Sequence, residues 1–237
     1  MDNRFGCWLD IPSPHVAEIV AQTGFDWVLI DLEHGPIGIE TASLMLMAIK
    51  GTAARGIVRI PELTEGWMKR ALDMGAHGVM VPNIANAEQA EQAARWFHYA
   101  PRGSRGEAQT VIRAAEWGRK AADYTGGMEL IIQIEHQTAL DQADAIAAID
   151  GVHMLFLGPS DFAAATGVAK DAPEVLNAAR QVASAAAAHG KRSGSVMFPT
   201  GTVEALHDAG ITDISIASDV ANLAATLDAT LASVKGG

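Results

Sequence analysis

The sequence predicts a (β/α)8 barrel, on three observations. Short apolar runs alternate eight times with alanine-rich segments along the 237 residues, as strands and helices do when they follow one another. The runs are continuous rather than interrupted by polar residues, which is typical of parallel strands that helices cover. Neither a G-x-G-x-x-G turn nor a complete G-x-x-x-x-G-K motif is present, which argues against a doubly wound nucleotide-binding sheet. We expect one barrel domain over residues 1–237.

Each expected element has a local reason. The strands are short runs rich in valine, isoleucine and leucine, at residues 7–9, 27–31, 56–60, 78–81, 130–135, 153–157, 193–197 and 211–216. The helices are rich in alanine, and several end before a glycine, which favours termination. They cover residues 14–23, 41–50, 65–74, 87–97, 138–149, 174–189, 202–209 and 219–234. Residues 98–127 form a connection long enough to predict a functional excursion.

Composition excludes several classes of protein. Hydrophobic residues make up 49% of the chain and charged residues 19%, which is enough for a sizeable core. The net charge of −11 argues against a nucleic-acid partner, whose phosphates need a basic face. Cys7 is the single cysteine, so the sequence contains no internal disulfide and no thiolate metal cage. No signal peptide and no membrane-spanning run is recognisable, and we expect a soluble cytoplasmic protein without a membrane partner.

Polar residues gather where the expected strands end. Catalytic groups of a barrel lie at the carboxyl ends of its strands, and Asp31, Glu33, Arg59, Gln133 and Glu135 occupy such positions. Residues two apart on a strand share a face, so these side chains are expected to point into the mouth together. Burying several carboxylates costs several kcal/mol each unless they are paired. A single arginine cannot neutralise them, which predicts a bound cation.

Glu135 and Asp161 are the predicted metal ligands. Oxygen ligands, without cysteine or a His-x-x-x-His helix, favour Mg²⁺ or Mn²⁺ over structural zinc. Two carboxylates leave most of an octahedral shell for water and for a chelating 2-oxo acid. The alternative is that both acids complement helix N-termini. The segment Gly158-Pro159-Ser160 is expected to cradle a carboxylate with backbone N–H groups, or else to be an ordinary turn with Ser160 as N-cap.

His34 and Arg59 are the expected proton-transfer and charge-stabilising groups. His34 follows a strand and precedes a Gly-Pro turn, where an imidazole would serve as a base or as a structural turn residue. His136 competes for the same role. Arg59 would stabilise an enolate oxygen, or else form a salt bridge to Glu33 or Asp31. No lysine ends an expected strand, which argues against Schiff-base chemistry.

Six segments together resemble the HpcH/HpaI aldolase family of metal-dependent, class II pyruvate aldolases. They are spread in order along nearly the whole chain: DWVLIDLEHGP at 26–36, VRIP at 58–61, GVMVP at 78–82, PRGSRG at 101–106, QIE at 133–135 and LGPSD at 157–161. The resemblance implies a barrel of the phosphoenolpyruvate/pyruvate type, whose last helix packs on a neighbouring subunit in a hexamer. Departures at His136, Asn83 and residues 195–198 bear on the choice of aldehyde.

The resemblance also implies site roles. Glu135 and Asp161 would bind Mg²⁺, Mn²⁺ or Co²⁺, Arg59 would stabilise the enolate, and His34 would be the base. Others follow by the same matching: Asp31 in the catalytic mouth, Gln133 beside the metal, Gly158, Pro159, Ser160 and Asp161 around the pyruvate carboxylate, Trp8 lining the pocket, and Asp73 reaching His34 of an adjacent subunit.

The expected reaction is the reversible aldol cleavage of a 4-hydroxy-2-oxo acid to pyruvate and an aldehyde through a metal-bound enolate. Two rivals remain at this point. A metal-dependent oxaloacetate decarboxylase needs the same cation and the same enolate. A non-catalytic metal-binding barrel would bind the ion without ionising pyruvate.

Overall fold

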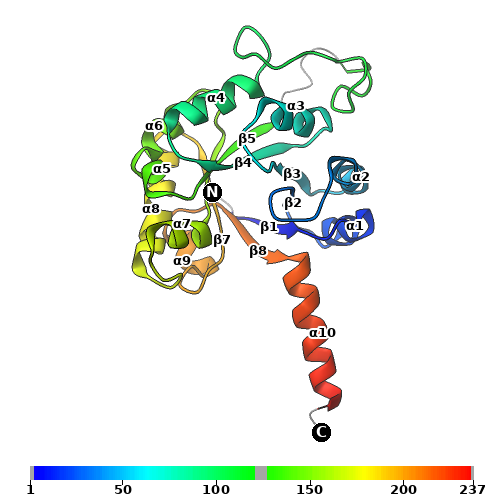
Figure 1. The fold of residues 1–237 in the computed structure, drawn as a ribbon. Coiled ribbons are helices and arrows are strands. Elements are labelled where there is room, and N and C mark those ends of the chain that lie inside the picture. The colour runs from blue at the N-terminus through cyan, green and yellow to red at the C-terminus, as the bar shows by residue number, and fades with distance from the viewer. Residues whose placement is uncertain (1–2, 121–126, 236–237) are drawn as a thin grey trace.

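The computed structural model describes residues 3–120 and 127–235, and within them the strands form a closed parallel barrel in the order β1 to β8 (Figure 1). The expected (β/α)8 fold is confirmed. The strands are β1 (Arg4–Leu9), β2 (Trp27–Asp31), β3 (Arg55–Arg59), β4 (Gly78–Ile84), β5 (Glu129–Ile134), β6 (Met154–Leu157), β7 (Arg192–Val196) and β8 (Asp213–Ser218). The expected strands agree with these to within a few residues at each end.

The expected helices lie close to helices of the structure, and one further helix, at residues 159–166, was not among the expected ones. The helices of the structure are α1 (Pro14–Gln22), α2 (Ile39–Ile49), α3 (Glu65–Asp73), α4 (Ala87–Phe97), α5 (Gln137–Asp141), α6 (Ala143–Ala148), α7 (Pro159–Thr166), α8 (Pro173–Ala188), α9 (Val203–Asp208) and α10 (Asp219–Lys235). The single helix expected at 138–149 is wrong, because the chain leaves helical geometry at Gln142 and divides it into α5 and α6. Of the excursion expected at 98–127, residues 121–126 lie outside the described part.

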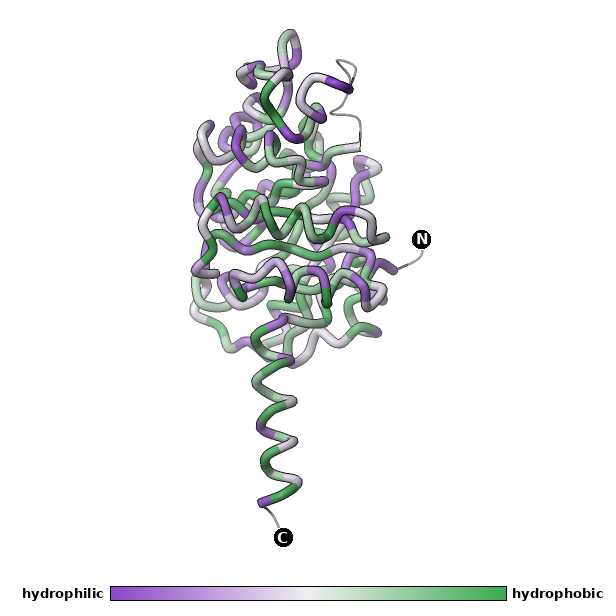
Figure 2. The backbone as a smooth tube through the Cα atoms, turned by 90° about the vertical axis from the view of Figure 1, so that its right-hand side faces the viewer, coloured by the Kyte–Doolittle hydropathy of each residue, from purple (hydrophilic) through white to green (hydrophobic). Residues whose placement is uncertain are grey.

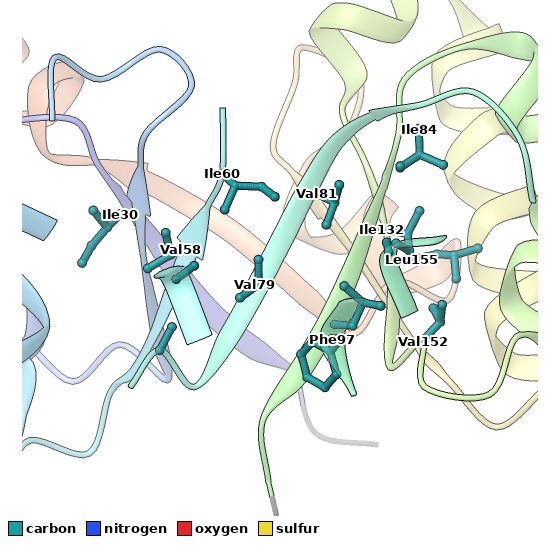
Figure 3. Packing of buried hydrophobic residues seen from close by; sticks show 14 of the residues in the cluster. Ile30, Val58, Ile60, Val79, Val81, Ile84, Phe97, Ile132, Val152 and Leu155 are labelled. Atoms are coloured by element: carbon teal, nitrogen blue, oxygen red, sulfur yellow. The ribbon is translucent and has the colours of Figure 1, made fainter. Parts of the chain in front are cut away.

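Alternation along the strands separates two apolar layers. One set of side chains packs outward against the helices, and Figure 3 shows part of this layer, including Ile30, Val58 and Ile132. The other set fills the barrel interior, and its members are Trp27, Leu29, Ile57, Met80, Ile131, Met154 and Phe156. Gly194 makes room for this interior layer, since a Cβ there would lie 2.4 Å from the Phe156 ring.

The helix α10 leaves the barrel after β8 and extends away from it (Figure 1), and Figure 2 shows hydrophobic and hydrophilic residues alternating along it. Asp219 is its one buried residue among those described, and Leu223, Leu227 and Leu231 are each at least half exposed. The exchange of this helix between subunits stays a prediction. No described helix is both long and apolar enough to cross a bilayer.

Candidate active site

The polar residues expected at the mouth continue the inward faces of three strands. Asp31 lies two residues beyond the interior Leu29, Arg59 two beyond Ile57, and Gln133 two beyond Ile131. Period-two alternation therefore carries a polar layer directly above the apolar one. Asp31, Arg59, Gln133 and Glu135 are all at most 5% exposed. The expectation that they share the inner face at the carboxyl ends of the strands agrees with this placement.

Arg59 is held from three sides. Its Nε and Nη2 donate to the two carboxylate oxygens of Asp31 at 2.9 and 2.6 Å, and its Nη1 lies 2.8 Å from Glu33 Oε2. The guanidinium carbon lies 4.5 Å from the centre of the Trp8 ring, a cation–π distance. Arg59 therefore uses two of its five N–H donors in hydrogen bonds to Asp31 and forms an ion pair with Glu33, which fixes its position and leaves donors for a ligand.

The pair of Asp31 and Arg59 stays ionised in spite of its burial. Burial alone would raise the pKa of Asp31, but hydrogen bonds from Arg59 and the arginine charge lower it below the usual value. The backbone N–H groups of Glu33 and His34 donate to the same carboxylate at 2.9 and 3.4 Å. Asp31 thereby positions both Arg59 and the loop that carries His34.

Glu135 is linked to Glu33 through Asn83. The backbone N–H of Asn83 donates to Glu135 Oε2 at 2.9 Å, and its side-chain amide donates to Glu33 Oε1 at 3.0 Å. Asn83 adopts a φ of 55°, in the left-handed region that asparagine tolerates better than most residues. Burial, with the negative charges of Asp161 and Glu33, raises the pKa of Glu135 to about 7.

Gly158 forms a close cradle beside Glu135. A Cβ at this position would lie 2.7 Å from Glu135 Oε1 and 2.9 Å from Gln133 Nε2, so only glycine lets the backbone approach so closely. Gly158 is also the N-cap of α7, so the alternative with Ser160 as N-cap is wrong. Pro159 stands at the first helical position, and Ser160 and Asp161 follow it, both exposed. First-turn N–H groups have no intrahelical acceptor, which suits an anion.

A cavity of about 470 Å³ opens beside Arg59. It is lined by Trp8, Asp10, Asp31, His34, Arg59, Val196, Met197, Ser215, Ile216, Ala217, Ser218, Ala221 and Asn222. His34 is exposed and reaches this cavity, as expected of a base. The rival histidine, His136, is the N-cap of α5 and is not among the lining residues described.

Asp73 lies elsewhere, at the last residue of α3. Its carboxylate accepts a hydrogen bond from Arg105 Nη2 at 2.6 Å, and the Arg105 guanidinium lies over the Tyr99 ring at 4.6 Å. A helix that follows a barrel strand runs back toward the opposite rim, so Asp73 belongs to the outer layer of its own subunit. Its expected approach to His34 of an adjacent subunit stays a prediction.

The sequence analysis missed Asp10, and it named Asn83 only as a departure from the family pattern, without its role as a link in the site. Asp10 directly follows β1 and lines the cavity, and Asn83 connects the two glutamates. For Asp10 the signal was present, because an acid directly after an apolar strand is the pattern that drew attention to Asp31. For Asn83, nothing in the sequence around it predicts the left-handed backbone conformation that lets it contact both glutamates.

The donor set fits a hard divalent cation that keeps most of its shell for other ligands. Glu135 and Asp161 are close enough for the charge of one to raise the pKa of the other, and Gln133 Oε1 is buried without a partner among the described atoms. Within residues 3–120 and 127–235, no three histidine, cysteine, aspartate or glutamate side chains form a ready-made cage. Mg²⁺ is usually bound through one or two carboxylates together with water and substrate oxygens.

Comparison with known proteins gives a consistent result. Residues 4–225 match the model of the HpcH/HpaI aldolase/citrate lyase family. The chain is 36% identical over 223 residues to 5-keto-4-deoxy-D-glucarate aldolases of Shigella boydii and Escherichia coli, covering 92% of this chain and 86% of each relative.

Solved structures agree with the family match. An HpcH/HpaI aldolase/citrate lyase family protein from Burkholderia cenocepacia superposes with a TM-score of 0.91 at 32% identity, covering 99% of this chain and 95% of that one. Macrophomate synthase superposes with a TM-score of 0.85 at 25% identity, covering 99% and 84%. The chain belongs to the HpcH/HpaI aldolase/citrate lyase family.

Proposed function

We propose that this protein is a class II pyruvate aldolase, which reversibly cleaves a 4-hydroxy-2-oxo acid to pyruvate and an aldehyde with a divalent cation. The observation that carries the proposal is the charge at the mouth, where Glu33, Glu135 and Asp161 interact around the single guanidinium of Arg59. A protein that needed only a stable barrel would not retain the buried Glu135 beside two further acids with one guanidinium to balance them.

Glu135 and Asp161 would bind the cation, which is Mg²⁺, Mn²⁺ or Co²⁺. When bound, such a cation draws electrons from the keto group of the substrate and so favours ionisation at the neighbouring carbon. Gly158 leaves room for the substrate beside Glu135, and the N–H groups of Ser160 and Asp161 would hold the substrate carboxylate.

His34 would remove a proton from the substrate, and Arg59 would stabilise the negative charge that develops on it. His34 reaches the cavity from an exposed loop and would take the proton of the C4 hydroxyl as the C3–C4 bond breaks. The electrons of that bond pass to the keto oxygen of the pyruvate half, where the remaining N–H donors of Arg59 would stabilise the negative charge. Asp31 holds Arg59 in its orientation throughout, and protonation of the enolate carbon completes pyruvate.

A hexamer is part of the proposal. The exposed leucines of α10 would be covered by a neighbouring subunit, and Asp73 of that neighbour would orient His34. Trp8, which stacks on Arg59, would form one wall of the aldehyde pocket.

The direct test is pyruvate release from a 4-hydroxy-2-oxo acid before and after chelation, followed by restoration with Mg²⁺, Mn²⁺ or Co²⁺. We expect chelation to abolish release and the metals to restore it. Full activity of the chelated enzyme would contradict the proposal. Oxaloacetate, assayed in parallel, distinguishes a decarboxylase, and exchange of the pyruvate methyl protons in D₂O distinguishes a metal-binding barrel without chemistry.

A further inference from the structure

We propose that Asp10 sets the aldehyde specificity of this enzyme, so that the mouth favours neutral, hydroxyl-bearing aldehydes over aldehydes that carry a carboxylate. The inference rests on the proposed aldolase function and adds the class of its second substrate. Its starting point is that Asp10 lines the same cavity as His34 and Arg59, on the side formed by β1, β8 and the start of α10.

The position of Asp10 is fixed by Asp219. One carboxylate oxygen of Asp219 accepts the backbone N–H of Asp10 at 2.9 Å, and the other accepts that of Ile11 at 3.0 Å. Asp219 is only 6% exposed and also accepts the N–H of Val220 at 2.7 Å. This buried carboxylate therefore clamps the turn after β1 to the start of α10, more than 200 residues later in the chain. The Asp10 side chain is consequently held at the cavity rather than carried by a free loop.

The described lining of the cavity offers no unpaired basic side chain that could bind a substrate carboxylate. Among its described lining residues, Arg59 is the one arginine or lysine, and it is already engaged by Asp31 and Glu33. Asp10 adds a further carboxyl group next to Asp31. Burial, with the charges of Asp31 and Asp219, raises the pKa of Asp10 to about 6, so Asp10 is mostly ionised in neutral or mildly alkaline solution. A second anion entering this space is repelled at short range.

The remaining polar groups suit hydroxyls. Ser218, Asn222 and Ser215 line the same cavity. Asn222 Oδ1 accepts the backbone N–H of Ser218 at 3.1 Å, which orients its amide so that the NH₂ group is the free end. An ionised Asp10 accepts hydrogen bonds from hydroxyl groups, and the Asn222 amide donates to them. The two groups together match a small hydroxyaldehyde and leave a carboxylate without a partner.

The test compares two aldehydes of the same carbon number, glycolaldehyde and glyoxylate, as partners of pyruvate at a pH of about 8. The readout is the ratio of kcat/KM for glyoxylate to that for glycolaldehyde, measured in the unaltered enzyme and in Asp10→Asn. Intrinsic reactivity differs between the aldehydes, but it cancels when this ratio is compared between variants. Removing one charge within a few ångströms of the substrate should raise the ratio about tenfold.

A matched control removes the same charge elsewhere. Asp208 is exposed at the end of α9, and Asp208→Asn should leave the ratio within about twofold of the unaltered enzyme. A structural defect from Asp10→Asn would lower kcat/KM for both aldehydes alike and leave the ratio unchanged. An unchanged ratio, or a ratio that falls, would overturn the role of Asp10.

Exchange of the pyruvate methyl protons in D₂O, measured for the same samples, separates this inference from the proposed function. Exchange with an unchanged ratio overturns the role of Asp10 alone. The absence of both exchange and condensation overturns the aldolase proposal, and the specificity inference falls with it.

Discussion

The two rims of the barrel both carry buried charges, but they are balanced in different ways. At the amino-terminal rim, the first residues of β1, β3, β5, β7 and β8 form one ion-pair network of three arginines and two acids. Arg192 joins Glu129 and Asp213, with 2.7 Å from its Nη1 to Asp213 Oδ1. Arg55 lies 3.4 Å from Glu129 and Arg4 3.8 Å from Asp213. Each acid of this rim has two cationic partners.

The carboxyl-terminal rim has the opposite balance. In the described part of the chain, five acids interact there with one another or with Arg59, the one arginine in those interactions: Asp10, Asp31, Glu33, Glu135 and Asp161. Arg59 donates two hydrogen bonds to Asp31, so Asp31 is the acid that it stabilises most directly. The pKa values of Glu135 and Asp10 rise to about 7 and about 6. One rim is thus a balanced network of ion pairs, while the other has the excess of acids on which the proposed cation site rests.

The largest expected effect is the loss of Arg59. Arg59→Ala should lower kcat/KM by about 1,000-fold, because it removes the group that would stabilise the enolate oxygen. It also leaves Asp31 buried without its partner, so the thermal midpoint must be measured together with the rate. Retained Mn²⁺ binding by a folded variant would show that the defect is catalytic. Activity within tenfold of the unaltered enzyme would remove Arg59 from the mechanism.

The loss of Arg192 should lower the stability of the protein and leave its kcat/KM nearly unchanged. Arg192→Met leaves Asp213, which is 1% exposed, with the Thr212 hydroxyl at 2.9 Å and with Arg4, at 3.8 Å, as its remaining described ion-pair partner. We expect the free energy of unfolding in urea to fall by about 3 kcal/mol, as when one partner is removed from a buried pair. The folded variant should keep its kcat/KM within about twofold, since the network lies at the rim without catalytic residues. A large loss of kcat/KM without a loss of stability would contradict the claim that the amino-terminal network has a structural role only.

The smallest expected effect is a pH dependence of stability that comes from Asp10. Burial and neighbouring acids raise its pKa from 3.8 to about 6, so the folded state binds this proton more tightly than the unfolded chain does. The contribution of Asp10 to stability is therefore full below about pH 4 and is lost as the pH rises through about 6. Asp10→Asn should flatten this part of the curve of urea midpoint against pH. An equally steep curve in the variant would assign the slope to other groups.

The barrel could be predicted because each strand and helix is indicated by the residues of its own short segment. Continuous apolar runs such as Trp27–Asp31, and alanine-rich stretches such as Ala87–Phe97, indicate their own state, and both elements have the expected bounds. The strand-end rule then placed Arg59 and Glu135 on one rim without knowledge of any contact. The single helix expected at 138–149 failed because nothing in the order of its residues marks the break at Gln142.

The contacts that complete the mouth could not be predicted in this way. The clamp from Asp219 to Asp10 joins the two ends of the chain, and closure of the barrel alone brings them together. The bridge by Asn83 needs a left-handed backbone that an asparagine permits but does not require. Such contacts depend on tertiary geometry, whereas the identity of the residues at each strand end does not.

The most direct measurement of the central claim is a Mn²⁺ titration followed by electron paramagnetic resonance, without any assay of turnover. The unaltered protein should bind one Mn²⁺ per subunit, and Glu135→Gln should weaken the binding about 100-fold. Glu129→Gln, which alters a carboxylate of the amino-terminal rim, is the matched control and should bind Mn²⁺ as the unaltered protein does. Equal binding by the two variants, or no binding by the unaltered protein at millimolar Mn²⁺, would contradict the claim that the mouth of the barrel is a divalent-cation site.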